Sequence, residues 1–265
     1  MDILLQQIIN GLVLGSMYAL IALGYTMVYG IIQLINFAHG EVLMIGALTS
    51  WSCIGMMQEA MPGAPGWVIL LLATLIACVV AAALNFSIEK TLPCSSPALP
   101  ALPDHGHWHV AAAADAGHDH LEAHHKPYPT LLPTTPFEIG GAVITSTQVL
   151  ILAVTAVALG AMVFLVNYTR WGRAMRATAE KPSRPRPWGV GSDMISATFI
   201  IGAVLAAIAG IMWASNYGTV QHTMGFLPGL KAFTAAAPGG IGNGGRRCRR
   251  PFAGVDRVHR LGLHR

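Results

Sequence analysis

The chain has 265 residues, of which 54% are hydrophobic and only 11% are charged, and its mean hydropathy is +0.55. A soluble domain usually carries about 25% charged residues, so this composition excludes an ordinary water-soluble enzyme and indicates an integral membrane protein. The net charge of +4 comes mainly from a central loop and from the tail after Gly245, which is not the pattern of a nucleic-acid-binding surface. The four cysteines have no paired spacing, so they predict neither a disulfide framework nor a zinc site.

The first predicted element is a transmembrane helix over Ile8–Tyr29. From Ile3 to Gly40 the chain has no acid or base apart from His39, and about 20 apolar residues are enough to cross a bilayer. No basic segment precedes this run, so we expect no cleaved signal peptide. Gly11 and Gly15 form a GxxxG pair, which is a weak signal for close helix packing in a chain with 29 glycines.

A polar cluster follows in sequence that is otherwise apolar enough for a membrane: Gln33, Asn36, His39 and Glu41. Polar side chains at such depth face protein or a water-filled cavity. One interpretation is a broken helix, with one piece over Ile31–Phe37 and a second over His39–Ser52 whose N-terminus would favour a substrate carboxylate. The alternative is a cytoplasmic turn in which Asn36 caps the next helix. The helix that we predict after the cluster covers about Val42–Met57.

A clear turn then leads to a third predicted span, Trp67–Phe86. After it the sequence changes abruptly, because Pro93–His125 is rich in Pro, Ala and His and contains seven histidines. Such a tract is typical of metal binding, but it is too polar and too rich in proline to cross a membrane. Lys90 and the basic loop after the next span would both be cytoplasmic. The chain therefore has to cross the membrane between Lys90 and Lys126, and one span is missing from the pattern.

The membrane pattern resumes after His125. The elements that we predict there are, in order, a proline-spaced loop over Lys126–Gly141, spans over Gln148–Val166 and Ile195–Trp213, and a short apolar helix that starts at Pro228–Gly229, contains Lys231 and ends at Gly239–Gly240. The last helix is too short to span a bilayer. It is typical of a half-helix that lines a substrate path.

A basic loop, Tyr168–Asp193, separates the last two long spans and contains six Lys and Arg residues. Short basic loops stay on the cytoplasmic side of a membrane. Arg173 and Arg176 form a stripe among small residues, which predicts one or two turns of surface helix ended by Pro182. This helix would transmit force to a cytoplasmic partner. The alternative is that the loop only sets the topology.

Five blocks of the chain follow one another in the order that one protein family shows. They are NGLVLGSMYALIALGYTMVYGIIQLINFAHGEVLMIGA (Asn10–Ala47), KPYPTLLPTTPFEIGG (Lys126–Gly141), GRAMRATAE (Gly172–Glu180), ISATFIIGAVLAAIAGIMWASNYGT (Ile195–Thr219) and MGFLPGLKAFTAA (Met224–Ala236). Together they resemble the permease subunits of bacterial ATP-binding-cassette importers for branched-chain amino acids, of the LivH type. The NFAHGE and GRAMRATAE blocks are the most specific. The resemblance covers well over half of the chain.

The resemblance implies an all-α, polytopic bundle of transmembrane helices with broken or half-spanning helices, in the bacterial inner membrane. Two permease subunits and two ATPase subunits would form the importer, and a periplasmic binding protein would deliver the amino acid. ATP would bind to the ATPase, so the resemblance implies no cofactor and no enzymatic activity for this chain. The ATPase would dock on Gly172, Arg173, Arg176, Glu180 and Gly189. The substrate would pass Asn36, His39, Glu41 and Lys231.

The chain departs from the family pattern at Pro93–His125, at Lys181–Trp188 and from Pro238 onward, after which we expect no further spans. The replacing text is rich in Pro, Arg, His, Gly and Ala, as expected of GC-rich DNA translated out of frame. This hypothesis divides the chain into transmembrane parts at 1–92 and 126–243 and aberrant parts at 93–125 and 244–265. The nucleotide sequence around codons 93, 181 and 238, read in all three frames, would test it.

Three functions remain open from the sequence. The first is a transporter permease, which would be inactive if the shifts are real. The second is a histidine-rich membrane protein that binds or transports metal, and the third is a structural membrane fragment. No nucleophile–base pair or metal-ligand helix motif is present, so we predict no catalytic and no metal-ligating residue. We expect Pro93–His125 to be irregular and to form no closed metal site.

Overall fold

In the computed structural model the described residues are 2–32, 36, 38–91, 125–131, 136–139, 141–180 and 190–236. They form a helical bundle whose long helices are α1 (Asp2–Ile32), α2 (His39–Ala60), α3 (Gly66–Thr91), α5 (Ser146–Tyr168) and α7 (Val190–Tyr217). Each of these five contains a stretch long and apolar enough to cross a membrane. Two short helices, α6 (Arg170–Glu180) and α8 (Phe226–Ala236), complete the helical part. The chain is a multi-pass, all-α membrane protein, as its composition predicts.

Every predicted span lies inside one observed helix, and the observed helices extend further at both ends. The break after the first span is also present, since α1 ends at Ile32 and α2 begins at His39. The separate helix predicted over Ile31–Phe37 is wrong in its first residues, because α1 continues without interruption to Ile32. Gln33–Ile35 and Phe37 lie outside the described residues. The predicted surface helix is longer than one or two turns, since α6 has 11 residues.

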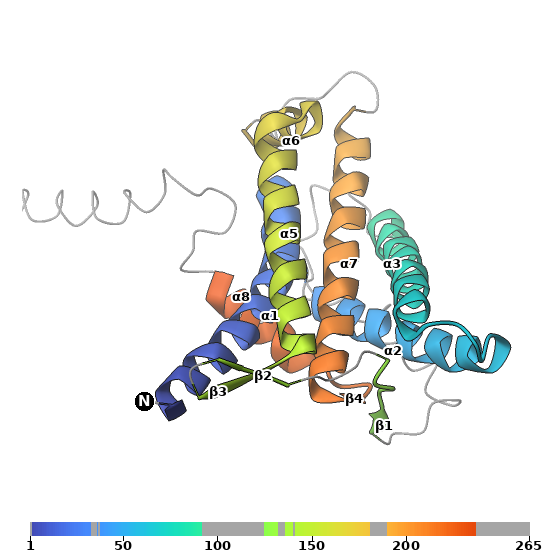
Figure 1. The fold of residues 1–265 in the computed structure, drawn as a ribbon. Coiled ribbons are helices and arrows are strands. Elements are labelled where there is room, and N and C mark those ends of the chain that lie inside the picture. Colours follow the sequence, from blue (N-terminus) through green and yellow to red (C-terminus); the bar gives the residue numbers. More distant parts are fainter. Residues whose placement is uncertain are drawn as a thin grey trace, which may run out of the picture.

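The two ends of the bundle differ in content (Figure 1). One end, here the α6 end, holds α6 together with the last turns of α3 and α5 and the start of α7. The opposite end holds the strands, the start of α5 and the end of α7. Lys90 near the end of α3 and Lys126 in the first strand therefore lie at opposite ends of the bundle, and residues 92–124 between them are outside the described part.

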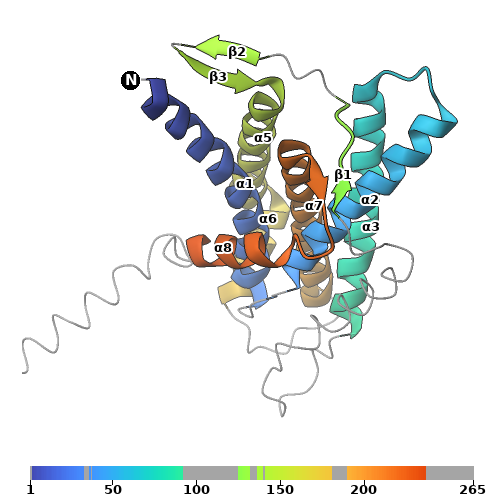
Figure 2. The same ribbon diagram turned by 90° about the horizontal axis from the view of Figure 1, so that it is seen from below.

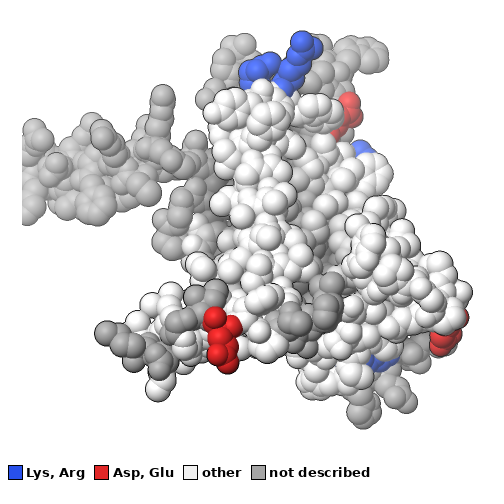
Figure 3. All heavy atoms as spheres, in the orientation of Figure 1, with Lys and Arg blue, Asp and Glu red and all other residues white. Residues whose placement is uncertain are grey.

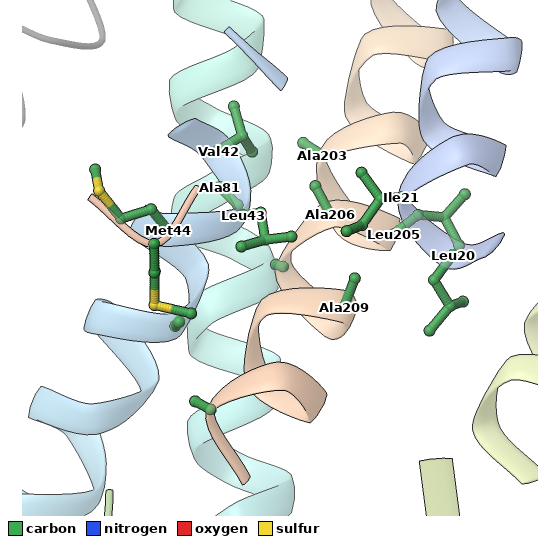
Figure 4. Close-up of a cluster of buried hydrophobic side chains, with 14 of the residues drawn as sticks. Leu20, Ile21, Val42, Leu43, Met44, Ala81, Ala203, Leu205, Ala206 and Ala209 are labelled. Atoms are coloured by element: carbon green, nitrogen blue, oxygen red, sulfur yellow. The ribbon is translucent and has the colours of Figure 1, made fainter. Parts of the chain in front are cut away.

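Helix α7 occupies the centre of the bundle and packs against α1, α2 and α3. Its buried face is rich in alanine, and Figure 4 shows Ala203, Ala206 and Ala209 facing side chains of α1 and α2. Small residues let transmembrane helices approach closely and gain van der Waals contact. Helix α2 crosses α3 and α7 at a steep angle rather than running beside them (Figure 2).

Two glycines mark the crossing of α2 and α7. A Cβ atom added at Gly46 of α2 would lie 2.6 Å from the Cα atom of Ala207. A Cβ added at Gly210 of α7 would meet the carbonyl group of Leu43. The backbones of the two helices therefore touch at this crossing, which leaves room for no larger side chain on either of them.

Short strands cover the end of the bundle opposite α6. Strand β1 (Lys126–Pro127) pairs antiparallel with β4 (Thr219–Val220), and β2 (Pro136–Ile139) pairs antiparallel with β3 (Ala142–Thr145). The predicted loop over Lys126–Gly141 thus contains two strands, although both are short. The turn between β2 and β3 includes Gly141 with a φ of 85°, a conformation that glycine adopts without a steric penalty.

Tyr128 joins the loop after β1 to the helices. It is 5% exposed, its hydroxyl lies 3.1 Å from the Ser50 hydroxyl of α2, and its backbone N–H donates to the Gly218 carbonyl at 2.9 Å. Nearby, the Trp51 indole N–H donates to the Pro127 carbonyl at 3.0 Å. These contacts hold β1 against α2.

We expect Tyr128→Phe to lower the free energy of unfolding by about 1 kcal/mol at neutral pH, because Ser50 loses a hydrogen-bond partner. Burial raises the pKa of the Tyr128 hydroxyl above its usual value near 10. The contribution of this hydroxyl to stability is therefore fully present below the unfolded pKa of ~10. It is lost as the pH rises from there through the higher pKa of the folded state. Thermal unfolding in detergent at pH 7 and pH 10.5 measures both effects.

The matched control is Tyr168→Phe, whose ring is 72% exposed. It should change neither the unfolding temperature at pH 7 nor the loss of stability at pH 10.5. Equal effects of the two variants would contradict the assignment of the buried hydrogen bond.

Candidate functional site

Asn36 accepts two hydrogen bonds just before and at the start of α2. The Asn36 side-chain oxygen accepts a hydrogen bond from the Ala38 N–H at 3.1 Å, and the Asn36 carbonyl accepts one from the His39 N–H at 3.2 Å. Ala38, not Asn36, occupies the N-cap position of α2 and provides no side-chain cap. The interpretation that Asn36 caps the helix is therefore wrong in detail, because its side chain stabilises the turn just before the helix.

His39 is the most deeply buried of the predicted path residues, at 1% exposed. Its ring packs on Tyr25 of α1, with ring centroids 4.7 Å apart. A Cβ added at Gly24 of α1 would collide with the ring, and one at Gly202 of α7 would lie 3.7 Å from it. The imidazole thus fills a socket between α1 and α7, which we call the His39 socket (Gly24, Tyr25 and Gly202). Glu41 follows in the first turn of α2 and is half-buried.

The first turns of α2 and α8 meet directly. A Cβ added at Gly40 would lie 2.6 Å from the Gly225 carbonyl oxygen, and one at Gly229 would lie 3.0 Å from the Gly40 Cα and 3.3 Å from the Tyr25 hydroxyl. Helix α8 is 11 residues long and too short to span a bilayer, as the sequence predicts. The N-terminal ends of two helices, each with a partial positive charge, therefore lie together in the interior.

Lys231 is not part of this junction. It follows Gly229 by two residues on α8, so the two positions lie on opposite sides of the helix. Lys231 is exposed and lines a cleft of about 350 Å³ with Tyr18 of α1 and Trp213 and Tyr217 of α7. The structure thus divides the four predicted path residues between the α1–α2 junction, which holds Asn36, His39 and Glu41, and a separate cleft, which holds Lys231.

Helix α6 is fixed to the end of α5 by Thr169. The Thr169 hydroxyl donates to the Leu165 carbonyl at 2.5 Å and accepts from the Gly172 N–H at 3.1 Å. A Cβ at Gly172 would collide with the carbonyl groups at the end of α5, so this position requires glycine for packing. Met175 is 4% exposed and anchors the inner face of α6 in the bundle.

The basic residues of α6 differ in their contacts. Arg170, Arg173 and Arg176 are exposed, and Figure 3 shows Lys and Arg atoms gathered at the α6 end. The Arg176 guanidinium donates to the Val166 carbonyl near the C-terminus of α5, where a cation is stabilised by the free carbonyl groups. Arg176 thus also stabilises the corner between the helices. Glu180 is the last residue of α6, and Gly189 lies outside the described residues.

A polar contact between α3 and α7 was not predicted. The Asn85 amide donates to the Phe199 carbonyl at 2.6 Å, and the Ser196 hydroxyl donates to the Glu89 carboxylate at 2.6 Å. Glu89 also pairs with Lys90 at 3.6 Å. The signal was present in the sequence, since Asn85 and Glu89 lie four residues apart and therefore share one face of a helix.

Comparison with known proteins assigns the chain to a protein family. A family profile described as "Branched-chain amino acid transport system / permease component" matches residues 7–94 and 119–247. The chain belongs to this permease family. It is 40% identical over 250 residues to the high-affinity branched-chain amino acid transport system permease protein BraD of Pseudomonas aeruginosa, covering 90% of this chain and 80% of that protein. No solved structure matches.

Two further relatives mark the range of similarity. The high-affinity branched-chain amino acid transport system permease protein LivH of Escherichia coli K12 is 39% identical over 251 residues, which is 90% of this chain and 80% of that protein. The autoinducer 2 import system permease protein LsrC of Yersinia pseudotuberculosis is 37% identical over only 82 residues, or 31% of this chain and 23% of that protein. The resemblance to LivH-type permeases is confirmed. These comparisons give no support to a metal transporter.

The family match refines two expectations. It omits residues 95–118, which fall within the histidine-rich tract Pro93–His125; apart from His125, this tract lies outside the described residues. The match also continues to residue 247, so the expectation that the family pattern fades from Pro238 is wrong by several residues. Lys181–Trp188 lies inside the matched range.

Proposed function

We propose that this permease imports branched-chain amino acids (leucine, isoleucine and valine) across the bacterial inner membrane as part of an ATP-driven importer. The observation that carries the proposal is the 40% identity to a high-affinity branched-chain amino acid permease over 90% of the chain. The basic α6 end supports the orientation, because positively charged short loops stay in the cytoplasm. The opposite end, with its strands and cleft, then faces the periplasm.

The importer would contain a second permease subunit, ATPase subunits and a periplasmic amino-acid-binding protein. We infer that the ATPase docks on α6 through Gly172, Arg173, Arg176 and Glu180, together with Gly189 in the following loop. Four of these residues, all except Gly189, lie on a helix that is joined to α5 by Thr169 and anchored by Met175. ATP binds to the ATPase, so this chain requires no cofactor.

Substrate would pass near the junction of α1, α2 and α8. The His39 socket lies between α1 and α7, and the loop after α6 leads directly into α7. Movement of α6 on the ATPase would therefore shift α7 and change the fit of His39 between its neighbours. In the described structure the His39 ring fills this socket, and the proposal requires a second arrangement in which it does not.

We also infer that residues 93–125 stand where the family has a further span. Their flanking residues lie at opposite ends of the bundle, and the family match omits 95–118. On this view the transmembrane parts are 1–92 and 126–243, with the loop 168–193 between the last two spans. The parts at 93–125 and 244–265 are aberrant in the proposal, although the family match still includes 93–94, 119–125 and 244–247.

The proposed function is tested by reconstitution. The full chain is combined in proteoliposomes with the ATPase subunits, a second permease subunit and the binding protein of a branched-chain amino acid importer. We expect labelled leucine, isoleucine and valine to accumulate only with hydrolysable ATP on the α6 side, and lysine and aspartate not to accumulate. An assembled complex that hydrolyses ATP but accumulates none of the three would contradict the proposal.

A further inference from the structure

The cleft beside Lys231 lies at the end of the bundle opposite α6 and is built by three helices. Tyr18 comes from α1, Trp213 and Tyr217 from α7, and Lys231 from α8, around a volume of about 350 Å³. Among the described residues that line it, Lys231 carries the one permanent charge. No acidic side chain among these lining residues neutralises it, so the cleft offers a cation to an anionic ligand.

The rings of the cleft form a continuous wall. The Tyr18 and Trp213 ring centroids are 5.7 Å apart, and those of Trp213 and Tyr217 are 4.9 Å apart. The faces of aromatic rings attract both ammonium groups and apolar chains. Leu14 and Met224 add apolar surface to the lining. The cleft therefore presents a cation, aromatic faces and an apolar patch within a small volume.

We propose that this cleft is a binding site for the free amino acid on the periplasmic side of the permease. Lys231 binds the α-carboxylate, the aromatic wall receives the α-ammonium group, and Leu14 and Met224 contact the apolar side chain. This combination matches a zwitterion with an apolar side chain. It disfavours basic side chains, because no acidic residue is among the described lining residues, which besides Lys231 include one histidine, His125. The inference rests on the proposed function, since it gives the imported amino acid its first contact with this chain.

A second lysine at the same end of the bundle, Lys126, lies outside the cleft. The Lys126 ammonium lies 4.5 Å from the centroid of the Trp51 ring, on a strand held against α2. Lys126 does not line the cleft. Lys126 carries the same charge as Lys231, lies at the same end of the bundle and has one aromatic neighbour, Trp51. Lys126→Gln is therefore a matched control for Lys231→Gln.

The test measures binding of labelled leucine to the full chain in phosphatidylcholine nanodiscs, without binding protein or ATPase. Competitors are leucinol, which lacks the carboxylate, and 4-methylpentanoate, which lacks the ammonium group. We expect Lys231→Gln to weaken leucine binding about tenfold or more, since a hydrogen bond to a charged group is lost. Lys231→Arg should retain most of the affinity, and Lys126→Gln all of it. Leucinol should compete about tenfold less well than leucine against the wild type, but equally well against Lys231→Gln.

Three results would overturn the inference: no saturable leucine binding to the wild-type chain, equal affinity in Lys231→Gln, or loss of binding when phosphatidylglycerol is added to the nanodiscs. The last would assign the cleft to an anionic lipid headgroup. These failures are distinct from failure of the proposed function. If reconstituted importers with Lys231→Gln accumulate leucine normally, the proposed function stands and the cleft site is refuted. If leucine binds at the cleft but the importer accumulates none, the cleft site stands and the proposed function is refuted.

Discussion

Reversing the charge of Arg173 (Arg173→Glu) will reduce leucine uptake by the reconstituted importer at least tenfold while the amount of inserted protein stays nearly constant. Arg173 is exposed on α6 at the end of the bundle where Lys and Arg gather. If the ATPase docks there, a like-charge contact costs several kcal/mol, and about 1.4 kcal/mol already corresponds to a factor of ten. Topology should survive, because Arg170 and Arg176 still mark the cytoplasmic side.

The measurement is uptake of labelled leucine per correctly inserted molecule, together with ATP hydrolysis. Adding Arg176→Glu should deepen the loss of uptake, but it should also lower thermal stability, because Arg176 donates to the Val166 carbonyl of α5. The single variant is therefore the cleaner probe. Normal uptake per inserted molecule with Arg173→Glu would show that α6 only sets topology and would refute the docking assignment.

Gly46→Val will destabilise the bundle by about 2 kcal/mol, in the range typical of overpacked cores. Its Cβ would lie 2.6 Å from the Cα of Ala207, so α2 and α7 would have to separate. The separation would also disturb the contact between Gly210 and Leu43 in the same crossing. We expect a clear fall in the thermal unfolding temperature of the detergent-solubilised protein and a smaller yield of monodisperse protein.

Gly55→Val is the matched control on the same helix. A Cβ at Gly55 would meet nothing within 4 Å, and this position is exposed. The two variants make the same chemical change in one helix, so any difference between them reports the crossing and not helix propensity. Unfolding temperatures that fall equally in both variants would contradict the account of the α2–α7 contact.

The long helices could be predicted because each is an apolar run of sufficient length, and the break before His39 because four polar residues interrupt such a run. The boundaries were short by several residues, since polar residues at helix ends continue the hydrogen-bonded backbone beyond the apolar part. The capping box at Thr145 and Gln148 is one such case, because it starts α5 before the predicted span.

Contacts between helices could not be predicted from the sequence. The His39 socket is built by residues of α1 and α7 around a side chain of α2. The pattern of polar residues along one helix does not say which neighbouring helix they meet. The same limit explains why Lys231 was grouped with His39, although the structure places it in another cleft. The polar face of α3 that Asn85 and Glu89 form could have been predicted, because their spacing of four residues puts both on one side of a helix.

The crossing of α2 and α7 has a mechanical consequence. It lies at Ala207–Gly210, roughly 28 Å along the axis from the first residue of α7 and roughly 13 Å from its last, at 1.5 Å per residue. A rigid rod held at such a point behaves as a lever with unequal arms. A sideways push at the α6 end would swing Tyr217 in the opposite direction by roughly half the distance and Trp213 by roughly a quarter. The same stroke that moves the α6 arm one way would therefore move one wall of the Lys231 cleft the other way.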